Sequence, residues 1–495
     1  MAKEWSAVFP ERLRSLLSQE GHGLRPTDES IHHQQKLARK LEICKTVYDT
    51  WTEGTAEPAK MAKPMVDGRL ETLREFVTVD EGEALRPREE ESTSEVDFRD
   101  AEDLSYEEFW LRYMYKNEPV VIRRAGKDWR ALREWVSSDG GGLLIDVLEE
   151  RFGDALVWVT YCSSTAEKSV GERERWTFRE YLVNYWQDEN KRRDVSLYLK
   201  DWHFPTEFAD YGAYVTPEYF KDDWLNEYYD YLQATAGPAG AEERTAQQAI
   251  EQSDYRFLYM GPKGTKTGLH ADVLRSYSWS INISGRKKWY LLPPRFTHLL
   301  YDTFGHNLAP SFFDVDEEMF PNIKLARKHL VEVHQGVDEV IFVPSGWHHT
   351  VENLEDTLSI NHNWFNVCNI NYSLELLQRE RHEAEQAICD CRAMCKDEKE
   401  FEELVQRNVA ANASMNYENF ASLLIMVAET RVRVLKGKGA ADNDNESLKQ
   451  AYEAKMAVAV LHQLLERITS EKFRDKLLVV VENVKAHLPH VNFGM

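Results

Sequence analysis

Two short segments of the 495-residue chain carry residue types that bind metals. His270-Ala-Asp272 places an imidazole and a carboxylate two residues apart, and Val343-Pro-Ser-Gly-Trp leads through a tight turn into the adjacent His348 and His349. One carboxylate and two imidazoles on one face of Fe(II) leave three coordination positions open, which is typical of non-haem iron oxygenases. The two segments together therefore predict an iron site, whose second imidazole comes from either His348 or His349.

Small polar residues alternate with large apolar ones along two predicted strands near these segments, 276–284 and 357–364. Because neighbouring side chains of a strand point to opposite faces, each polar row lies on one side of a sheet. A solvent-facing side explains one such row, but exposed strands usually carry Lys, Glu and Thr. Because two strands carry such a row, we favour the interpretation that both rows line the inside of a barrel that holds a polar ligand. The rows contain Ser280, Asn282, Asn361 and Asn363.

Lys287 follows a predicted hairpin turn at Gly285-Arg286 and begins an apolar strand. A lysine that points into a barrel requires a counter-charge, because burial disfavours the charged form. A dicarboxylate cosubstrate would supply that charge. The alternative is that Lys287 faces solvent, as we expect of Arg286 and Lys288.

The elements that must position these residues divide the chain into three parts. Short predicted strands separated by Gly and Pro turns dominate 255–365, which is typical of a barrel or a double-sheet sandwich. Helical periodicity precedes them at 33–52 and 65–78 and follows them after residue 370. We therefore expect an α+β chain with an N-terminal helical extension and acidic linker (1–95), a catalytic domain (96–370) and a C-terminal helical region (371–495). The C-terminal helices are predicted at 373–395, 399–413, 417–435 and 447–469.

The charge balance limits the classes of partner. Lys and Arg total 61 against 84 Asp and Glu, a net charge of −23. Nucleic acid is an unfavourable partner for such a chain because phosphate contacts need a basic face, whereas basic proteins are attracted at long range. No apolar stretch approaches the ~18 residues of a membrane helix. Six cysteines are too few for a disulfide scaffold, which favours a reducing compartment, the cytoplasm or the nucleus.

The late cysteines and the C-terminal helices have simple interpretations. On a helix, Cys391 and Cys395 share a face that Cys389 does not join, and no fourth zinc ligand has suitable spacing. A structural role is therefore favoured over a zinc site. The apolar stripes of the C-terminal helices predict a bundle that packs on the barrel, and these helices could also form a homodimer.

Three segments together resemble the jumonji-C hydroxylases. They are 260–272, 285–294 and 343–353, and Trp279 adds to the match. The resemblance extends over roughly 96–372. It implies a double-stranded β-helix, that is, a jelly-roll or cupin-like core, and dependence on Fe(II), 2-oxoglutarate and O2.

The resemblance also implies roles for individual residues. Alignment of Pro-x-Gly-Trp-x-His makes His349 the distal metal ligand beside His270 and Asp272. The cosubstrate contacts that it implies are Tyr198, Thr267, Lys287 and either Asn361 or Asn363. Some relatives carry an Asn next to the Trp of the first polar strand, but in this chain Ser280 occupies that position and Asn282 lies nearby.

Within the family, the sequences beginning at Tyr198, His270 and Gly285, together with the helical tail, are most similar to the lysyl hydroxylases of the eukaryotic translation termination (release) factor. This subgroup implies that the chain hydroxylates a lysine side chain of that protein. A histone or protein lysine demethylase is an alternative, although such enzymes usually carry chromatin-reading or zinc modules. A tRNA-modifying jumonji-C hydroxylase would need a basic surface, and a non-enzymatic scaffold would not need the triad and the lysine together.

Overall fold

The computed structural model describes residues 95–138, 142–165, 168–235, 254–305 and 307–438, and scattered positions between 449 and 480. The predicted helices at 33–52 and 65–78, the acidic linker and most of the predicted helix 447–469 lie outside this described part. The proposed division at residues 95 and 370 stays a prediction. Among the described helices, none combines the length and the hydropathy that crossing a membrane requires.

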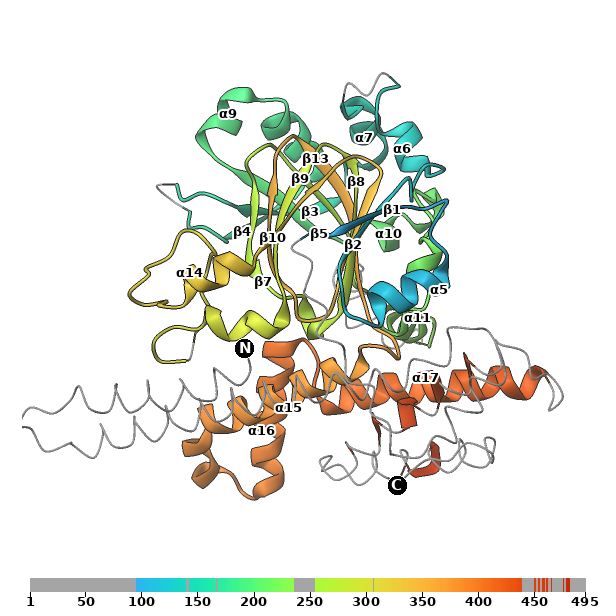
Figure 1. The fold of residues 1–495 in the computed structure, drawn as a ribbon, viewed down its shortest axis with the longest axis vertical. Coiled ribbons are helices and arrows are strands. Elements are labelled where there is room, and N and C mark those ends of the chain that lie inside the picture. Colours follow the sequence, from blue (N-terminus) through green and yellow to red (C-terminus); the bar gives the residue numbers. More distant parts are fainter. Residues whose placement is uncertain are drawn as a thin grey trace, which may run out of the picture.

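Two sheets face each other to form the core (Figure 1). The larger sheet has nine strands in the order β1-β2-β11-β8-β13-β6-β5-β3-β4, and the smaller has four in the order β10-β9-β12-β7. From β7 to β13 the chain crosses from one sheet to the other at each step except between β9 and β10, which pair within the smaller sheet. The pairings among these strands are antiparallel. The predicted α+β class with a jelly-roll, cupin-like core is therefore confirmed. The strands are β1 (Asp97–Asp100), β2 (Val120–Arg123), β3 (Leu156–Tyr161), β4 (Arg173–Thr177), β5 (Leu197–Trp202), β6 (Arg256–Gly261), β7 (Lys266–His270), β8 (Tyr277–Ser284), β9 (Lys287–Leu292), β10 (Val331–Gln335), β11 (Glu339–Val343), β12 (His348–Asn353) and β13 (Thr357–Trp364).

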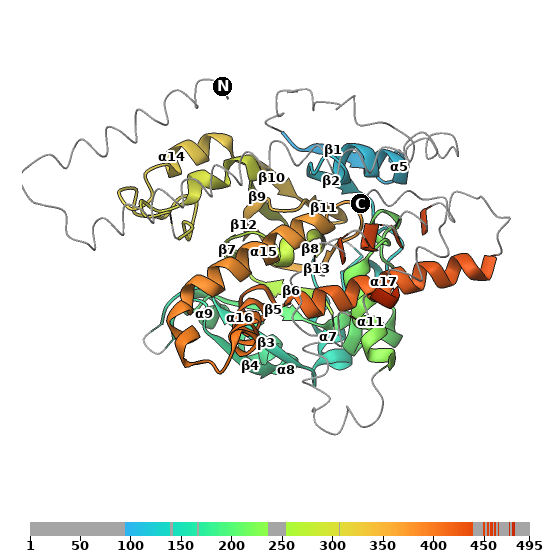
Figure 2. The same ribbon diagram turned by 90° about the horizontal axis from the view of Figure 1, so that it is seen from below.

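Helices surround the sheets and extend beneath them. Figures 1 and 2 show α15, α16 and α17 lying across one end of the core. The predicted helix 373–395 is too long, because α15 ends at Ala387 and Cys389–Met394 forms a 3₁₀ turn. The α-helices are α5 (Tyr106–Phe109), α6 (Arg130–Glu134), α7 (Ile145–Phe152), α8 (Phe178–Tyr181), α9 (Glu189–Asp194), α10 (Phe204–Glu207), α11 (Trp224–Thr235), α14 (Ile323–Ala326), α15 (Ile370–Ala387), α16 (Glu398–Ala413) and α17 (Tyr417–Lys438).

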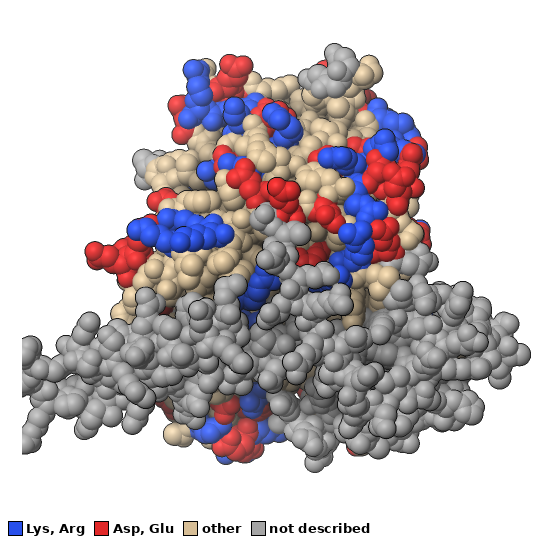
Figure 3. Space-filling view, viewed as in Figure 1, with Lys and Arg blue, Asp and Glu red and all other residues tan. Residues whose placement is uncertain are grey.

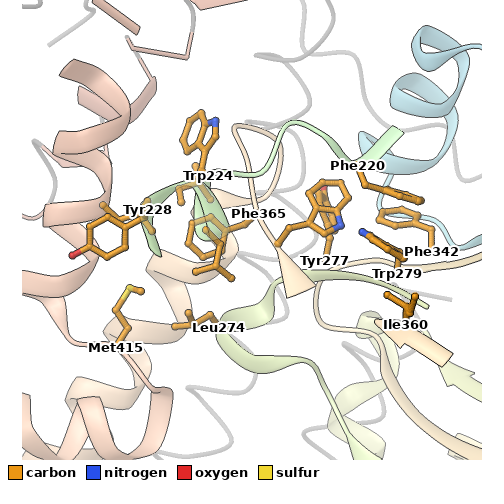
Figure 4. Packing of buried hydrophobic residues seen from close by; sticks show 14 of the residues in the cluster. Phe220, Trp224, Tyr228, Leu274, Tyr277, Trp279, Phe342, Ile360, Phe365 and Met415 are labelled. Atoms are coloured by element: carbon orange, nitrogen blue, oxygen red, sulfur yellow. The ribbon is translucent and has the colours of Figure 1, made fainter. Parts of the chain in front are cut away.

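The apolar rows of β8 and β13 pack outward against the elements that cover the large sheet. Trp279 of β8 stacks on Phe220 with ring centroids 5.4 Å apart, and Phe342 and Ile360 join the same cluster (Figure 4). Burial of each such side chain contributes about 1.5–3 kcal/mol. With its apolar row fixed in this outer core, each strand must turn its polar row toward the space between the sheets.

The space between the two sheets is apolar on one side and polar on the other. Side chains of β2 and β11 meet side chains of β9, β10 and β12 in a separate apolar cluster that includes Trp289 and Ile341. The rows of β8 and β13 fill the polar side, where Ser280, Asn282 and Ser359 are almost completely buried. The polar rows are therefore interior rows and do not face solvent.

Candidate metal centre

His270, Asp272 and His349 converge in the polar interior. Each offers one ligand atom, and these atoms lie within 4.8 Å of one another. His270 ends β7 and pairs with His349 across the antiparallel β7–β12 ladder, so the two rings approach to 4.3 Å between centroids. Asp272 follows two residues after His270, where the chain leaves the small sheet for β8. Two segments far apart in sequence therefore meet in one metal-sized cluster.

Backbone carbonyls orient both imidazoles. The Nδ1 atom of His270 lies 2.9 Å from the carbonyl oxygen of Gly268, and that of His349 lies 3.0 Å from the carbonyl oxygen of Trp347. A carbonyl oxygen only accepts, so each Nδ1 carries the proton and each Nε2 keeps a free lone pair. Burial, with a further contribution from His349, lowers the pKa of His270. The site thus keeps this imidazole neutral, which is the metal-binding form.

Two side chains hold the carboxylate of Asp272. Ser278 Oγ donates to Oδ2 at 2.7 Å, and Asn363 Nδ2 donates to Oδ1 at 2.9 Å. Asn226 of α11 donates in turn to the backbone carbonyl of Asn363 at 3.0 Å. Asn363 therefore lies against the candidate metal ligand, and the cosubstrate contact expected for it stays a prediction.

His348 points to the opposite side of β12. Its Nδ1 lies 3.2 Å from Thr297 Oγ1, whereas adjacent His349 joins His270 and Asp272. Because successive side chains of a strand point to opposite faces, only one of these two neighbouring histidines can face the interior. The register of β12 therefore brings His349, and not His348, to the candidate cluster, and its role as a metal ligand stays a prediction.

Lys287 is buried in the same interior, with 2% of its surface exposed. Its Nζ donates to Ser359 Oγ at 2.6 Å, and no carboxylate of the described residues lies within ion-pair distance. Burial, followed by the charge of Lys200, lowers the pKa of Lys287 to about 7. Lys287 therefore does not face solvent, and its ammonium form has no counter-charge among the described residues.

A tyrosine and an asparagine lie at the Lys287 end of the interior. Asn353 is the register partner of Lys287 on β12, and it hydrogen-bonds the side chain of Tyr198. Burial raises the pKa of Tyr198, so it is a neutral phenol. Glycine at position 261 allows both side chains to approach the backbone of β6. A Cβ there would lie 2.5 Å from Tyr198 Cδ2 and 2.8 Å from Asn353 Nδ2.

The remaining expected contacts lie around the same space. Thr267 of β7 is half-buried and opposite Val351, and Asn361 of β13 is opposite Ser280. Several buried polar atoms here have no hydrogen-bond partner, at a cost of roughly 1–3 kcal/mol each. They are Ser280 Oγ, Asn282 Oδ1, Asn353 Oδ1 and Asn361 Oδ1. Unsatisfied polar atoms, an uncompensated cation and a His-Asp-His cluster fit a metal together with an anionic ligand.

Comparison with known proteins agrees with this geometry. Residues 106–370 match the family model described as a cupin-like domain. The 2-oxoglutarate and iron-dependent oxygenase JMJD4 of Gallus gallus is 39% identical over 70% of this chain and 77% of its own length, and that of Homo sapiens is 34% identical over 74% and 86%. The arginine-specific demethylase JMJ20 of Arabidopsis thaliana is 45% identical over 64% of this chain and 67% of its own length. The chain belongs to the cupin-like jumonji-C family.

Sequence reasoning missed several residues of this jumonji-C site. Ser278 and Ser359 stood in the predicted polar rows, and strand periodicity alone could have marked them. Lys200 lies two residues after Tyr198 on β5, a spacing that predicts a shared face. Asn226 donates to the backbone carbonyl of Asn363 from a helix far away in sequence, and no motif or spacing in the sequence indicates this contact.

The late cysteines are not part of any such cluster. Within the described ranges, the only group of histidine, cysteine and acidic residues spaced for a metal is His270, Asp272 and His349. Cys389 is exposed, and the thiol of Cys395 donates to the carbonyl oxygen of Cys391 at 3.4 Å. This contact agrees with the structural interpretation.

Proposed function

We propose that this chain is an Fe(II)- and 2-oxoglutarate-dependent oxygenase that hydroxylates a lysine side chain of the translation termination (release) factor. The observation that carries the oxygenase assignment is the His270, Asp272 and His349 cluster beside the buried, uncompensated Lys287. The names of the JMJD4 relatives support the same cofactor and cosubstrate. Support for the lysyl substrate comes from the sequence similarity to release-factor hydroxylases.

In this proposal His270, Asp272 and His349 hold Fe(II). Bound iron, with 2-oxoglutarate and O2, supplies the oxidation of a substrate C–H bond, with succinate and CO2 as coproducts. The carbonyl-oriented imidazoles and the doubly hydrogen-bonded Asp272 keep the ligand atoms in place before any metal arrives.

Lys287 binds the distal carboxylate of 2-oxoglutarate, assisted by Tyr198 and Thr267. Ser359 fixes the direction of the ammonium group, and Asn361, Ser280 and Asn282 offer polar atoms along the ligand. The apolar cluster around Trp289 closes the other side of the space and keeps water from it. Charge-assisted contacts in such a dry interior are stronger than contacts at the surface.

Cosubstrate affinity should fall as the pH rises above the pKa of Lys287, about 7. The protonated ammonium attracts a dicarboxylate and the neutral amine does not, so the dissociation constant should rise toward tenfold per pH unit above that value. Calorimetric titration of the Mn(II)-loaded protein with 2-oxoglutarate at several pH values measures this slope. The same titration of Lys287→Met should show a flat profile, and a flat profile for the unmodified protein would contradict the assignment.

Arginine demethylation is the second candidate, because JMJ20 is 45% identical to this chain. The lysine demethylase alternative requires the same oxidation at an N-methyl carbon. A tRNA substrate is less favoured, since the net charge is −23 and the Lys and Arg residues on the face in Figure 3 are interspersed with Asp and Glu. The proposal places the reaction in the cytoplasm or the nucleus, and a homodimer through the C-terminal helices stays a prediction.

The reaction product separates these candidates. Hydroxylation of a carbon not bonded to nitrogen gives a stable alcohol, so an unmethylated lysine of the release factor should gain one oxygen atom per succinate formed. Oxidation of an N-methyl group releases formaldehyde and leaves the peptide one methylene lighter. Intact-mass and fragment analysis of both substrate classes, with 2-oxoglutarate omitted as the control, reads out the two outcomes. Formaldehyde from methyl-arginine or methyl-lysine peptides, together with an unmodified release factor, would replace the hydroxylase proposal with a demethylase.

A further inference from the structure

The chain leaves the candidate metal centre through a strained turn. Directly after Asp272, Val273–Arg275 forms one turn of 3₁₀ helix that leads into β8. Leu274 has φ 55° and Arg275 has φ 49°, so two consecutive residues that are not glycine adopt the left-handed region. Such conformations persist where the surrounding structure enforces them, and they are frequent at functional sites. The Val273–Arg275 turn therefore needs support from other elements.

The backbone of Asp272 belongs to this turn. Its carbonyl oxygen accepts a hydrogen bond from the backbone N–H of Arg275 at 3.1 Å. Its carboxylate makes no hydrogen bond to the turn and accepts instead from Ser278 and Asn363. The contacts of the carboxylate fix the end of the side chain, whereas the turn fixes the backbone from which the side chain extends. Both are needed to keep this ligand atom beside the two imidazoles.

A serine of the C-terminal helical region holds the turn. Ser373 lies in the first turn of α15, and its side chain has no exposed surface. Its Oγ donates to the carbonyl oxygen of Leu274 at 2.8 Å in a buried contact. Loss of this hydroxyl would leave the carbonyl oxygen of a strained residue without its donor, which is costly in a buried place.

Side-chain contacts connect the same turn to the same region. Leu274 is 1% exposed and lies in one apolar cluster with Phe365 and Met415 (Figure 4). Arg275 Nη1 lies 3.5 Å from Oε2 of Glu375, two residues after Ser373 on α15. Both left-handed residues are therefore held by contacts that α15 or its neighbours supply.

We infer that Ser373 is a positioning residue for the metal centre, whose hydroxyl holds the strained turn so that Asp272 presents its carboxylate beside His270 and His349. The inference rests on the proposed function, because it assumes that these three residues bind the metal. Ser373 is not itself a member of the ligand cluster and acts through Leu274. The C-terminal helices then contribute to the geometry of the site as well as to packing beneath the barrel.

Metal affinity measured without turnover tests the inference. Residues that orient metal ligands typically change metal affinity ~10–100-fold, and Ser373 acts through the backbone, so Ser373→Ala should raise the Mn(II) dissociation constant about 10-fold. Ser373→Cys has a similar shape and a weaker donor, so its value should lie between those of Ser373→Ala and the unmodified protein. At saturating Mn(II), the dissociation constant of 2-oxoglutarate should change less than about 3-fold in both variants, since its distal carboxylate binds at Lys287. Calorimetric titrations give both constants.

Tyr219→Phe is the matched control. It also removes a hydroxyl that donates to a buried backbone carbonyl oxygen at 2.8 Å, that of Leu104, and it should leave Mn(II) affinity unchanged. Thermal unfolding of the metal-free proteins measures how much stability each variant loses.

Three results would overturn the inference and leave the proposed function in place. They are an unchanged Mn(II) dissociation constant in both Ser373 variants, an equal change in Tyr219→Phe, and a loss of 2-oxoglutarate affinity as large as the loss of Mn(II) affinity. Failure of the unmodified protein to bind Mn(II) would instead overturn the proposed function.

Discussion

Alanine in place of His270, Asp272 or His349 is expected to abolish turnover, whereas His348→Ala should retain metal binding. Each of the three removes one ligand atom from a cluster whose members lie within 4.8 Å of one another. Loss of an outer hydrogen-bond partner typically costs ~10–100-fold, so loss of a ligand itself should cost on the order of 10³-fold or more in rate. Succinate formation measures turnover, and calorimetric titration with Mn(II) measures metal binding.

His348→Ala is the matched control for His349→Ala because both remove a buried imidazole from the same strand. The two side chains are 9% and 3% exposed, so their losses of packing are similar. His348 contacts Thr297 and not the triad. Metal binding that survives in His349→Ala and is lost in His348→Ala would show that the register of β12 at the site is shifted by one residue.

The metal motif was recognisable in the sequence because the turns that require glycine lie a few residues before the side chains that form the site. Gly346, in the turn that leads from β11 to His349, has φ 73°, a conformation that favours glycine. Gly285, in the hairpin before Lys287, has φ 77°, and a Cβ there would clash with the backbone carbonyl oxygen of Asp356. Glycines required by the turns therefore stand at fixed offsets from residues required by the site.

The rest of the site depends on tertiary placement, which leaves no local pattern. Asn226 reaches the backbone of Asn363 from α11, and nothing in the spacing of the two residues indicates that contact. Lys200 lies over the Tyr198 ring beside a bulge whose left-handed residue is Asp201 and not a glycine, so no local motif marks this position. The burial of both faces of β8 likewise depends on which elements cover the large sheet. Periodicity could show that the strand has two different faces but not that both are enclosed.

Replacing Lys287 with methionine should raise the KM for 2-oxoglutarate by about 30-fold or more, because a buried charge-assisted contact is worth about 2–5 kcal/mol. Lys288→Met, on the adjacent residue of β9, should change KM little. Lys288 lies over the Tyr290 ring and is not enclosed in the interior. Initial rates at varied 2-oxoglutarate, with the protein substrate held constant, give both values. Equal, small effects would remove Lys287 from the cosubstrate site.

The same substitution should change the stability of the ligand-free protein in the opposite direction. Burial lowers the pKa of Lys287 from 10.5 to about 7, so between these values the unfolded chain binds more protons than the folded one. The free energy of unfolding should therefore rise as the pH rises through this window, and it should be lowest below pH 7, where the buried amine is charged. Lys287→Met fills a similar volume without a charge, so it should remove this dependence and raise Tm at pH 7. Thermal unfolding of both proteins across the window measures the effect. A gain in stability with a loss of cosubstrate affinity would show that the fold maintains this buried cation for its ligand.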